Sequence, residues 1–274
     1  MRRSRRQERE RDVRDGPQRN TRPKKKSADR PVVYGLLPVL ELLRVGSRRI
    51  DKVIVAEGAR ESRISEILDL ARQRDILVDR VGRENFSRFL PEDANHQGVL
   101  AFTSAAEYAD ADEILSGLGE TALILILDGI EDPRNLGALL RTAECAGVDG
   151  VLIPERRAVG LTDTVVRSSA GATEYIKVAK VPNLNRLIDD LKEKDIWIAG
   201  AAGDATTDYA EWDWNRPTAL VLGSEGSGLH RLVAEKCDVL VKIPMYGKIG
   251  SLNVSVAAGV ILFEARRQRI AKRK

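Results

Sequence analysis

Three loops carry the residues whose types and spacing could do chemistry. The first spans 127–147 (LDGIEDPRNLGALLRTAECAG), where an aspartate ends an apolar run and Asn135 and Arg141 follow. Asn135 is well suited to cap the helix that begins there, because a short amide accepts a hydrogen bond from a free backbone N–H. Arg141 is expected off the apolar face of that helix, within its first two turns. It serves either a bound ligand or only a surface ion pair with Glu144.

The second loop, LVLGSEGSGLH (220–230), places three glycines within six residues after an apolar strand. Gly223, Gly226 and Gly228 let a ligand approach the backbone and leave N–H groups free near a helix start. Their GxxGxG spacing is not that of a dinucleotide fold, and the Gly-Lys-Ser/Thr of a P-loop is missing. A tight structural turn would show the same glycines. Glu225, an acid between them, points to function more strongly.

The third loop lies within 243–269, IPMYGKIGSLNVSVAAGVILFEARRQR. Ile243 and Met245 leave a strand, a glycine-rich stretch follows, and Ser251 to Asn253 open the last helix. That helix starts with small residues, which allow close approach of another backbone from the same chain or from a second subunit. Core packing alone would favour the same small residues, and Asn253 would then serve only as a helix cap.

Regular alternation of strands and helices positions these loops. The runs Ala122–Asp128 and Thr218–Leu222 are continuously apolar, which is typical of strands buried on both faces. Strand–helix alternation predicts a parallel α/β sheet with helices on both faces, and ligands bind at the carboxyl ends of such strands. The other predicted strands are Gly150–Ile153, Tyr175–Val181, Trp197–Ala201 and Val239–Ile243, with helices near 136–146, 162–169, 184–194, 229–236 and 253–270.

The chain divides into four parts by composition. Residues 1–30 carry thirteen Lys/Arg against five Asp/Glu and hardly an apolar side chain, which predicts a disordered basic tail. Residues 31–104 read as a small α/β unit, with helices over 38–44 and 61–73 and strands over 52–57, 76–81 and 97–103. Residues 105–120 are acidic and form a linker with about one helical turn. Residues 121–274 form the large α/β unit.

Charge and composition limit the function classes. The net charge of +4 belongs to the two ends, because residues 31–265 hold 26 Lys/Arg against 36 Asp/Glu. A basic tail either follows nucleic-acid phosphates or only keeps a chain in solution. No apolar run reaches the roughly 18 residues of a membrane span, and the start lacks the apolar stretch of a secretory signal. The lone Cys145 and Cys237 argue against a structural zinc site and suit a reducing cytoplasm.

Taken together and in this order, the three loops are specific. The set N-x5-R, LxLGxEGxG and IPM…GSLNVSVAAG resembles the signature motifs of the SpoU (TrmH-like) RNA ribose 2′-O-methyltransferases of the SPOUT superfamily, over about residues 122–270. The region from Val33 to Gly98 resembles the small ribosomal-protein-like substrate domain of the ribosomal branch. Leu37 departs from this pattern, since many relatives have a polar residue there. Within the family, the likeness is greatest to bacterial 23S rRNA guanosine-2′-O methyltransferases.

The resemblance carries expectations that periodicity could not give. It implies a C-terminal trefoil knot, a rare feature among folds. It implies S-adenosyl-L-methionine as methyl donor without a metal, RNA (most simply rRNA) as partner, and a homodimer whose active site borrows from the partner subunit. It assigns contacts with the methyl donor to Gly223, Ile243 and Leu252, with Met245 nearby. It assigns the shaping of the catalytic site to Asn135, Arg141, Glu225, Ser251 and Asn253.

The family's essential arginine matches Arg141, for which the role of base has been proposed. An arginine with a pKa above about 12 is a poor base, so we expect Arg141 to hold a phosphate and polarise the 2′-hydroxyl. Whether that phosphate or a water takes the proton is open. Other interpretations are a tRNA target, a non-catalytic RNA-binding protein, and a conventional Rossmann enzyme. The last would place its glycine loop after the first strand.

Overall fold

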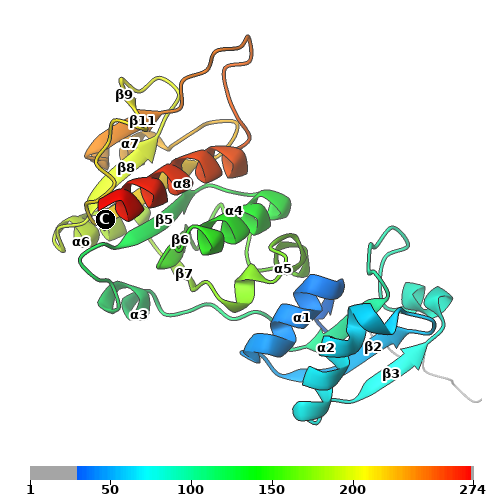
Figure 1. Cartoon of the computed structure of the whole chain (residues 1–274). Helices are drawn as coiled ribbons and strands as arrows, with labels where there is room; N and C mark the ends of the chain where they lie inside the picture. Colours follow the sequence, from blue (N-terminus) through cyan, green and yellow to red (C-terminus); the bar gives the residue numbers. More distant parts are fainter. Residues whose placement is uncertain (1–29, 273–274) are drawn as a thin grey trace, which may run out of the picture.

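The computed structural model describes residues 30–272, which fold around two separate β-sheets (Figure 1). The predicted basic tail lies outside the described residues except for Arg30. Within 30–272, no helix is long and apolar enough to cross a membrane.

The first sheet belongs to the small N-terminal unit and has the strand order β1-β4-β2-β3. β4 runs antiparallel to both β1 and β2, whereas β2 and β3 are parallel. Two helices cover this sheet with apolar side chains, among them the fully buried Leu42, Ile64 and Ile67. The elements are β1 (Val32–Tyr34), α1 (Leu36–Val45), β2 (Ile50–Ala56), α2 (Glu61–Gln73), β3 (Val78–Val81), a 3₁₀ helix (Arg83–Arg88) and β4 (Val99–Thr103).

The second sheet has seven strands in the order β7-β6-β5-β10-β8-β11-β9, and every pairing is parallel. This confirms the predicted α/β class. Its elements begin with α3 (Ala111–Ser116), β5 (Leu123–Asp128), α4 (Pro133–Cys145), β6 (Gly150–Pro154), α5 (Asp163–Ser168), a 3₁₀ helix (Ala172–Glu174), β7 (Val178–Val181) and α6 (Leu184–Lys192). They continue with β8 (Trp197–Ala201), β9 (Thr207–Asp208), β10 (Thr218–Gly223), α7 (Arg231–Lys236), β11 (Val239–Lys242) and α8 (Val254–Lys272).

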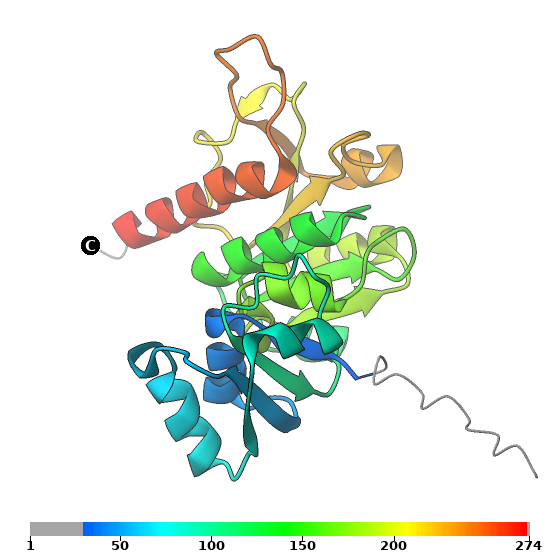
Figure 2. The same cartoon turned by 90° about the vertical axis from the view of Figure 1, so that its right-hand side faces the viewer.

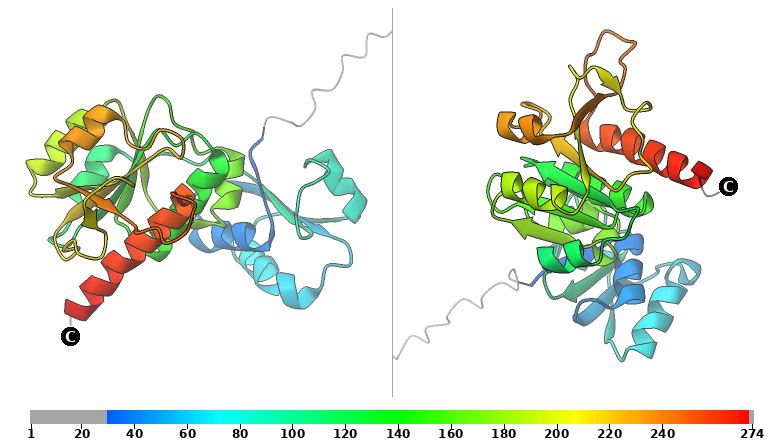
Figure 3. Two further views of the ribbon diagram at one scale, coloured as in Figure 1. Left: turned by 90° about the horizontal axis from the view of Figure 1, so that it is seen from above. Right: turned by 90° about the vertical axis from the view of Figure 1, so that its left-hand side faces the viewer.

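Helices cover both faces of the large sheet, as Figure 3 shows. Along β5, Leu123, Leu125 and Leu127 enter one core with α4, α5 and α8. The alternate residues Ile124 and Ile126 enter a second core with α3, α6 and α7. Because side chains of a strand alternate between faces, a strand covered on both sides must be apolar throughout. This explains the unbroken ALILIL run.

The helix of the first loop begins three residues earlier than its apolar pattern suggests. Asp132 is its N-cap, and its carboxylate accepts a 2.7 Å hydrogen bond from the backbone N–H of Arg134. Pro133 takes the first helical position, where its missing N–H and fixed φ are tolerated. The prediction that Asn135 caps this helix is therefore wrong. Arg141 becomes the ninth residue of the helix, in its third turn instead of the first two.

Other differences from the sequence analysis concern short elements. The three-residue β1, the two-residue β9 and both 3₁₀ helices carry too few residues for a periodic pattern. β7 begins at Val178 instead of Tyr175, because a 3₁₀ turn precedes it. The segment read as a linker contains α3, whose Ile114 is buried in the second core. The trefoil knot implied by the resemblance stays a prediction.

The small unit lies below the large unit in Figure 2. A buried ion pair joins the two units. Arg48 Nε donates to Glu174 Oε2 over 3.1 Å, and its terminal nitrogen contacts the other carboxylate oxygen. The two side chains are 7% and 2% exposed. Ser47 Oγ donates to the same carboxylate over 2.8 Å. Each buried charge is compensated by the other and by the added hydrogen bonds. Removing either partner would leave an uncompensated buried charge, which strongly destabilises a protein.

Glu174→Gln should therefore destabilise the protein, because it leaves the Arg48 guanidinium buried without its counter-charge. We expect a loss of about 3–5 kcal/mol in the free energy of unfolding, measured by urea denaturation. The matched control is Glu235→Gln, which breaks the exposed Arg231–Glu235 pair on α7. That pair should contribute less than about 1 kcal/mol. Equal losses in the two variants would contradict a special role for the buried pair.

Candidate active site

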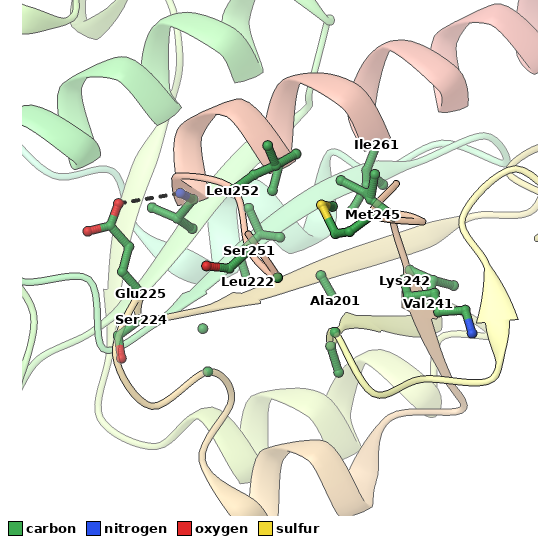
Figure 4. A pocket seen from close by; sticks show the side chains of 18 of the residues that line it. Ala201, Leu222, Ser224, Glu225, Val241, Lys242, Met245, Ser251, Leu252 and Ile261 are labelled. Carbon is green, nitrogen blue, oxygen red and sulfur yellow. Dashed lines mark hydrogen bonds between the residues drawn. The ribbon is translucent and has the colours of Figure 1, made fainter. Parts of the chain in front are cut away.

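A hollow of about 570 Å³ opens at the carboxyl ends of three adjacent strands, β10, β8 and β11. Its size falls in the range of small-molecule sites, and its place is where parallel sheets bind ligands. The N-terminal end of α8 and the loop before it form one wall (Figure 4). That loop projects from the body (Figure 2), and its Tyr246 is 97% exposed.

The second and third loops of the sequence analysis meet in this hollow. All four residues predicted to contact the methyl donor line it, and so do two of the predicted catalytic residues. Figure 4 shows Met245, Leu252 and Ser251 on one side and Glu225 at one end. Gly223 and Ile243 contribute from the ends of β10 and β11. Their grouping agrees with the predicted assignment, and their roles stay proposals.

Asn253 joins the three loops through hydrogen bonds. Its Nδ2 donates to Asn135 Oδ1 over 3.0 Å and also to a carboxylate oxygen of Glu225. Its Oδ1 accepts from the backbone N–H of Ser255 over 3.0 Å, which caps α8. Asn253 is thus both a helix cap and the centre of a polar network. The predicted helix cap is formed, and a role of Asn253 in catalysis stays a proposal.

Gly223 is required by the chain itself. A Cβ at this position would lie 2.1 Å from the carbonyl carbon of Gly228 and 2.3 Å from the nitrogen of Leu229. These are backbone atoms, which cannot yield as a flexible side chain would. The backbone at the end of β10 can therefore approach the backbone at Gly228 and Leu229 this closely only if residue 223 is glycine. At Gly226, by contrast, a Cβ would meet nothing within 4 Å.

Arg141 lies apart from this hollow. It is exposed on α4 and lines a separate depression of about 350 Å³ together with Leu37 and Glu41 of α1 and Tyr175. The Glu41 carboxylate accepts from the Tyr175 hydroxyl and raises the pKa of Tyr175 to about 12. Among the described residues, no carboxylate lies within ion-pair distance of Arg141, so the alternative pairing with Glu144 is not formed.

Two features of the site escaped the sequence analysis. Ala201, Ala202 and Gly203 line the hollow from the end of β8. Small residues after a central strand were the available signal, but the order of strands was unknown. The other feature is a hydrogen-bonded pair of Asp128, the last residue of β5, and His230, in the loop after the adjacent strand β10. Over residues 30–272, no group of three His, Cys, Asp or Glu side chains could hold a metal ion.

The fold and the site define a class of protein. A small-molecule hollow bounded by glycine loops adjoins a network of amides and a carboxylate, and a buried ion pair fixes a second, smaller unit to the same α/β unit. This arrangement suits an α/β enzyme that binds a small donor molecule and acts on a larger substrate held by the second unit.

Comparison with known proteins identifies the family. Residues 122–263 match the model of the SpoU rRNA methylase family, and residues 32–109 match the model for RNA 2′-O ribose methyltransferase substrate binding. The chain belongs to the SpoU methylase family and is an RNA methyltransferase. These matches confirm the family that the three motifs predicted.

Individual relatives agree with this assignment. YacO of Bacillus subtilis (strain 168), grouped with the TrmH family tRNA/rRNA methyltransferases, is 43% identical over 86% of this chain and 95% of its own. The SpoU methyltransferase AviRb from Streptomyces viridochromogenes, crystallised with AdoMet, matches with a TM-score of 0.73 and 25% identity, over 88% of this chain and 90% of its own. A structure concerned with 2-OH methylation of C/U34 on tRNA matches with a TM-score of 0.50 and 25% identity, over 56% of this chain and 99% of its own.

Gly223→Ala tests whether the β10 loop shapes the hollow. The added methyl must displace the backbone at Gly228, so we expect the affinity for S-adenosylmethionine to fall by about tenfold or more, measured by calorimetry. Gly226→Ala, three residues away on the same loop, has room for its methyl and should retain the affinity. If both variants bind equally well, the geometry of Gly223 does not control the hollow.

Proposed function

We propose that the protein transfers the methyl group of S-adenosylmethionine to a ribose 2′-hydroxyl of RNA, most simply of a guanosine in 23S rRNA. One observation carries this proposal: the hollow at the strand ends is joined by Asn253 to the polar residues of all three loops. A donor in the hollow would thus have a polar surface for the accepting group directly beside it.

The residues of the hollow fit S-adenosylmethionine. The donor supplies a methyl group activated on a positively charged sulfur. Apolar Ile243, Leu252 and Met245 would hold its flat apolar parts, and the backbone around Gly223 offers hydrogen-bonding groups. Glu225 contributes a carboxylate at the rim, which suits a cationic ligand. Small residues such as Ala201 leave room for it.

The catalytic residues would act by positioning. Asn135, Glu225 and Asn253 form one hydrogen-bonded unit, and Ser251 lies on the same rim. Fixed donors and acceptors of this kind would hold the ribose 2′-hydroxyl in line with the methyl group that it attacks. This positioning removes much of the entropic part of the activation barrier. Arg141 would bind an RNA phosphate, because its planar group of donors matches phosphate and never loses its charge.

Arg141 requires a second copy of the chain to reach this site. In one chain, the depression that it lines shares no residue with the donor hollow. A dimer solves this if α4 of one protomer faces the hollow of the other. α8 offers a surface for such a dimer: Val256, Phe263 and Ile270 are each about half exposed and seven residues apart, so they form one apolar stripe.

The small unit favours rRNA over tRNA as the target. The relative concerned with tRNA C/U34 matches only 56% of this chain although almost all of its own length is used. That chain therefore has no counterpart of the small unit. The additional unit here, matched to a substrate-binding model, is what a larger RNA substrate would need. A cytoplasmic location would follow from such a substrate.

Arg141→Ala and Arg141→Lys should lose methyl transfer by on the order of a hundredfold, about 2.7 kcal/mol of barrier, with normal binding of S-adenosylmethionine. Lysine keeps the charge but not the planar set of donors.

Mixing Arg141→Ala with inactive Glu225→Gln then tests the dimer. Random pairing makes half of the dimers mixed, each with one intact site, so about a quarter of the activity should return. An Arg141 that acts within its own chain would give no recovery.

The target can be mapped in vivo. A strain lacking the gene should lose a 2′-O-methyl group at one guanosine of 23S rRNA, detected by protection against alkaline cleavage. The wild-type gene should restore that methyl group, and the Arg141→Ala gene should not. Loss of the modification from a tRNA instead would overturn the rRNA assignment while leaving ribose methylation intact.

A further inference from the structure

A second hollow, of about 380 Å³, adjoins the donor hollow. The two share Ser224, Glu225 and Val254 as lining residues, so they are neighbours across the polar network. Figure 4 shows Ser224 and Glu225 at this end of the donor hollow. Asn135 and His230 complete the polar side of the second hollow. A ribose placed there would lie next to the donor.

His230 is held in this hollow by a buried carboxylate. Asp128 ends β5 with its side chain only 5% exposed, and its Oδ1 lies 2.8 Å from His230 Nδ1. Its Oδ2 accepts from the backbone N–H of His230, also over 2.8 Å. Both oxygens are thus committed to one residue. The imidazole itself is about half exposed, so its other nitrogen is accessible.

The carboxylate determines the tautomer of the ring. An ionised carboxylate only accepts hydrogen bonds, so Nδ1 carries the proton and Nε2 of the neutral ring keeps its lone pair. A histidine with this arrangement is a proton acceptor, and the carboxylate stabilises the imidazolium that forms. The methyl transfer needs such an acceptor, because the 2′-hydroxyl must lose its proton and Arg141 cannot take it.

We propose that His230, positioned by Asp128, accepts the proton of the ribose 2′-hydroxyl; this rests on the proposed function. The 2′-oxygen forms a bond to the methyl carbon while the bond between that carbon and sulfur breaks, its electron pair going to sulfur. The 2′-proton moves to His230 Nε2. The products are the 2′-O-methylated RNA, S-adenosylhomocysteine and an imidazolium that returns its proton to water.

Charged side chains from several elements surround the imidazole ring. Glu131 and Asp132 from the β5–α4 loop and Glu225 from the β10 loop line the same hollow, in addition to Asp128 beneath the ring. Arg157, from the loop after β6, also lines it. On the helix that follows His230, Arg231 is paired with Glu235. Carboxylates outnumber cations around the ring, which suits a group that becomes positive during the reaction.

His230→Gln tests the proposal, because glutamine keeps a polar side chain but cannot take up a proton. The single-turnover rate at neutral pH should fall by about a hundredfold or more, with unchanged affinity for S-adenosylmethionine and RNA. The wild-type rate should fall as acid protonates the ring, and this acidic limb should vanish in His230→Gln. Glu235→Gln, on the same helix but outside both hollows, should keep the wild-type rate and limb.

Nuclear magnetic resonance checks the geometry without any turnover. The chain has two histidines, so ¹H–¹⁵N spectra of labelled wild type and His96→Asn assign the His230 ring. We expect the proton on Nδ1 in wild type and a mixture of tautomers in Asp128→Asn. His96→Asn should also retain the acidic limb. A ring protonated on Nε2 at neutral pH would overturn the proposal.

The outcomes separate the two levels of inference. If wild type methylates ribose and His230→Gln matches it in rate and pH profile, the proton acceptor is wrong and the proposed function stands. If wild type methylates a base and not ribose, the proposed function fails and His230 loses its role with it.

Discussion

The burial of Arg269 near the end of α8 is the constraint on which the site depends. Its guanidinium is almost fully buried and donates to backbone carbonyls of Thr121, Ala122, Trp214 and Arg216. Burial lowers the pKa of Arg269, with the nearby Arg266 adding to the effect, and the four carbonyls supply the partners that a buried cation needs. Two of these carbonyls directly precede β5 and another comes shortly before β10. The C-terminal end of α8 is thus fixed where the strands begin. A helix of 19 residues spans about 28 Å, so its first turn reaches the opposite edge of the sheet, where the strands end.

That placement explains how residues far apart in the chain form one network. Asn253 opens α8, and its amide bridges Asn135, 118 residues earlier, and Glu225, 28 residues earlier. The Asn253 amide is the donor in both contacts, so its loss would break the links to both other loops. The same residue caps the start of α8 and contacts Glu225, which lines the hollow. The helix cap and the polar network thus both depend on Asn253.

Sequence patterns determined the parts of the fold that repeat. The ALILILD run indicated a doubly covered strand, and the alternation that follows indicated a parallel sheet. Two-residue and three-residue strands carry no such pattern, and the order of strands depends on long-range packing. The cap of α4 was misassigned because the apolar stripe begins at Leu136, whereas Asp132 and Pro133 start the helix. The four residues that motif order assigned to the methyl donor line one hollow, and their role stays a prediction. Motif order could not show that Arg141 lies outside this hollow. Its position depends on which side of α4 it occupies and on the packing of α1 from the small unit beside it.

The position of the arginines also accounts for how an acidic body could hold RNA. Residues 31–265 carry an excess of acidic side chains, so attraction to phosphate must be local. A hollow between the two units, of about 660 Å³, is lined by Arg134 and Arg167 from the large unit and by Tyr34 from the small one. The Arg167 guanidinium lies over the Tyr34 ring, 4.8 Å from its centroid, which holds a cation against an aromatic face of the small unit. Arg141 lies on the same helix as Arg134, facing the same unit. The ion pair of Arg48 and Glu174 holds the two units together at this seam. Cations from α4 and α5 are thereby concentrated along one boundary, where RNA bound by the small unit would meet Arg141.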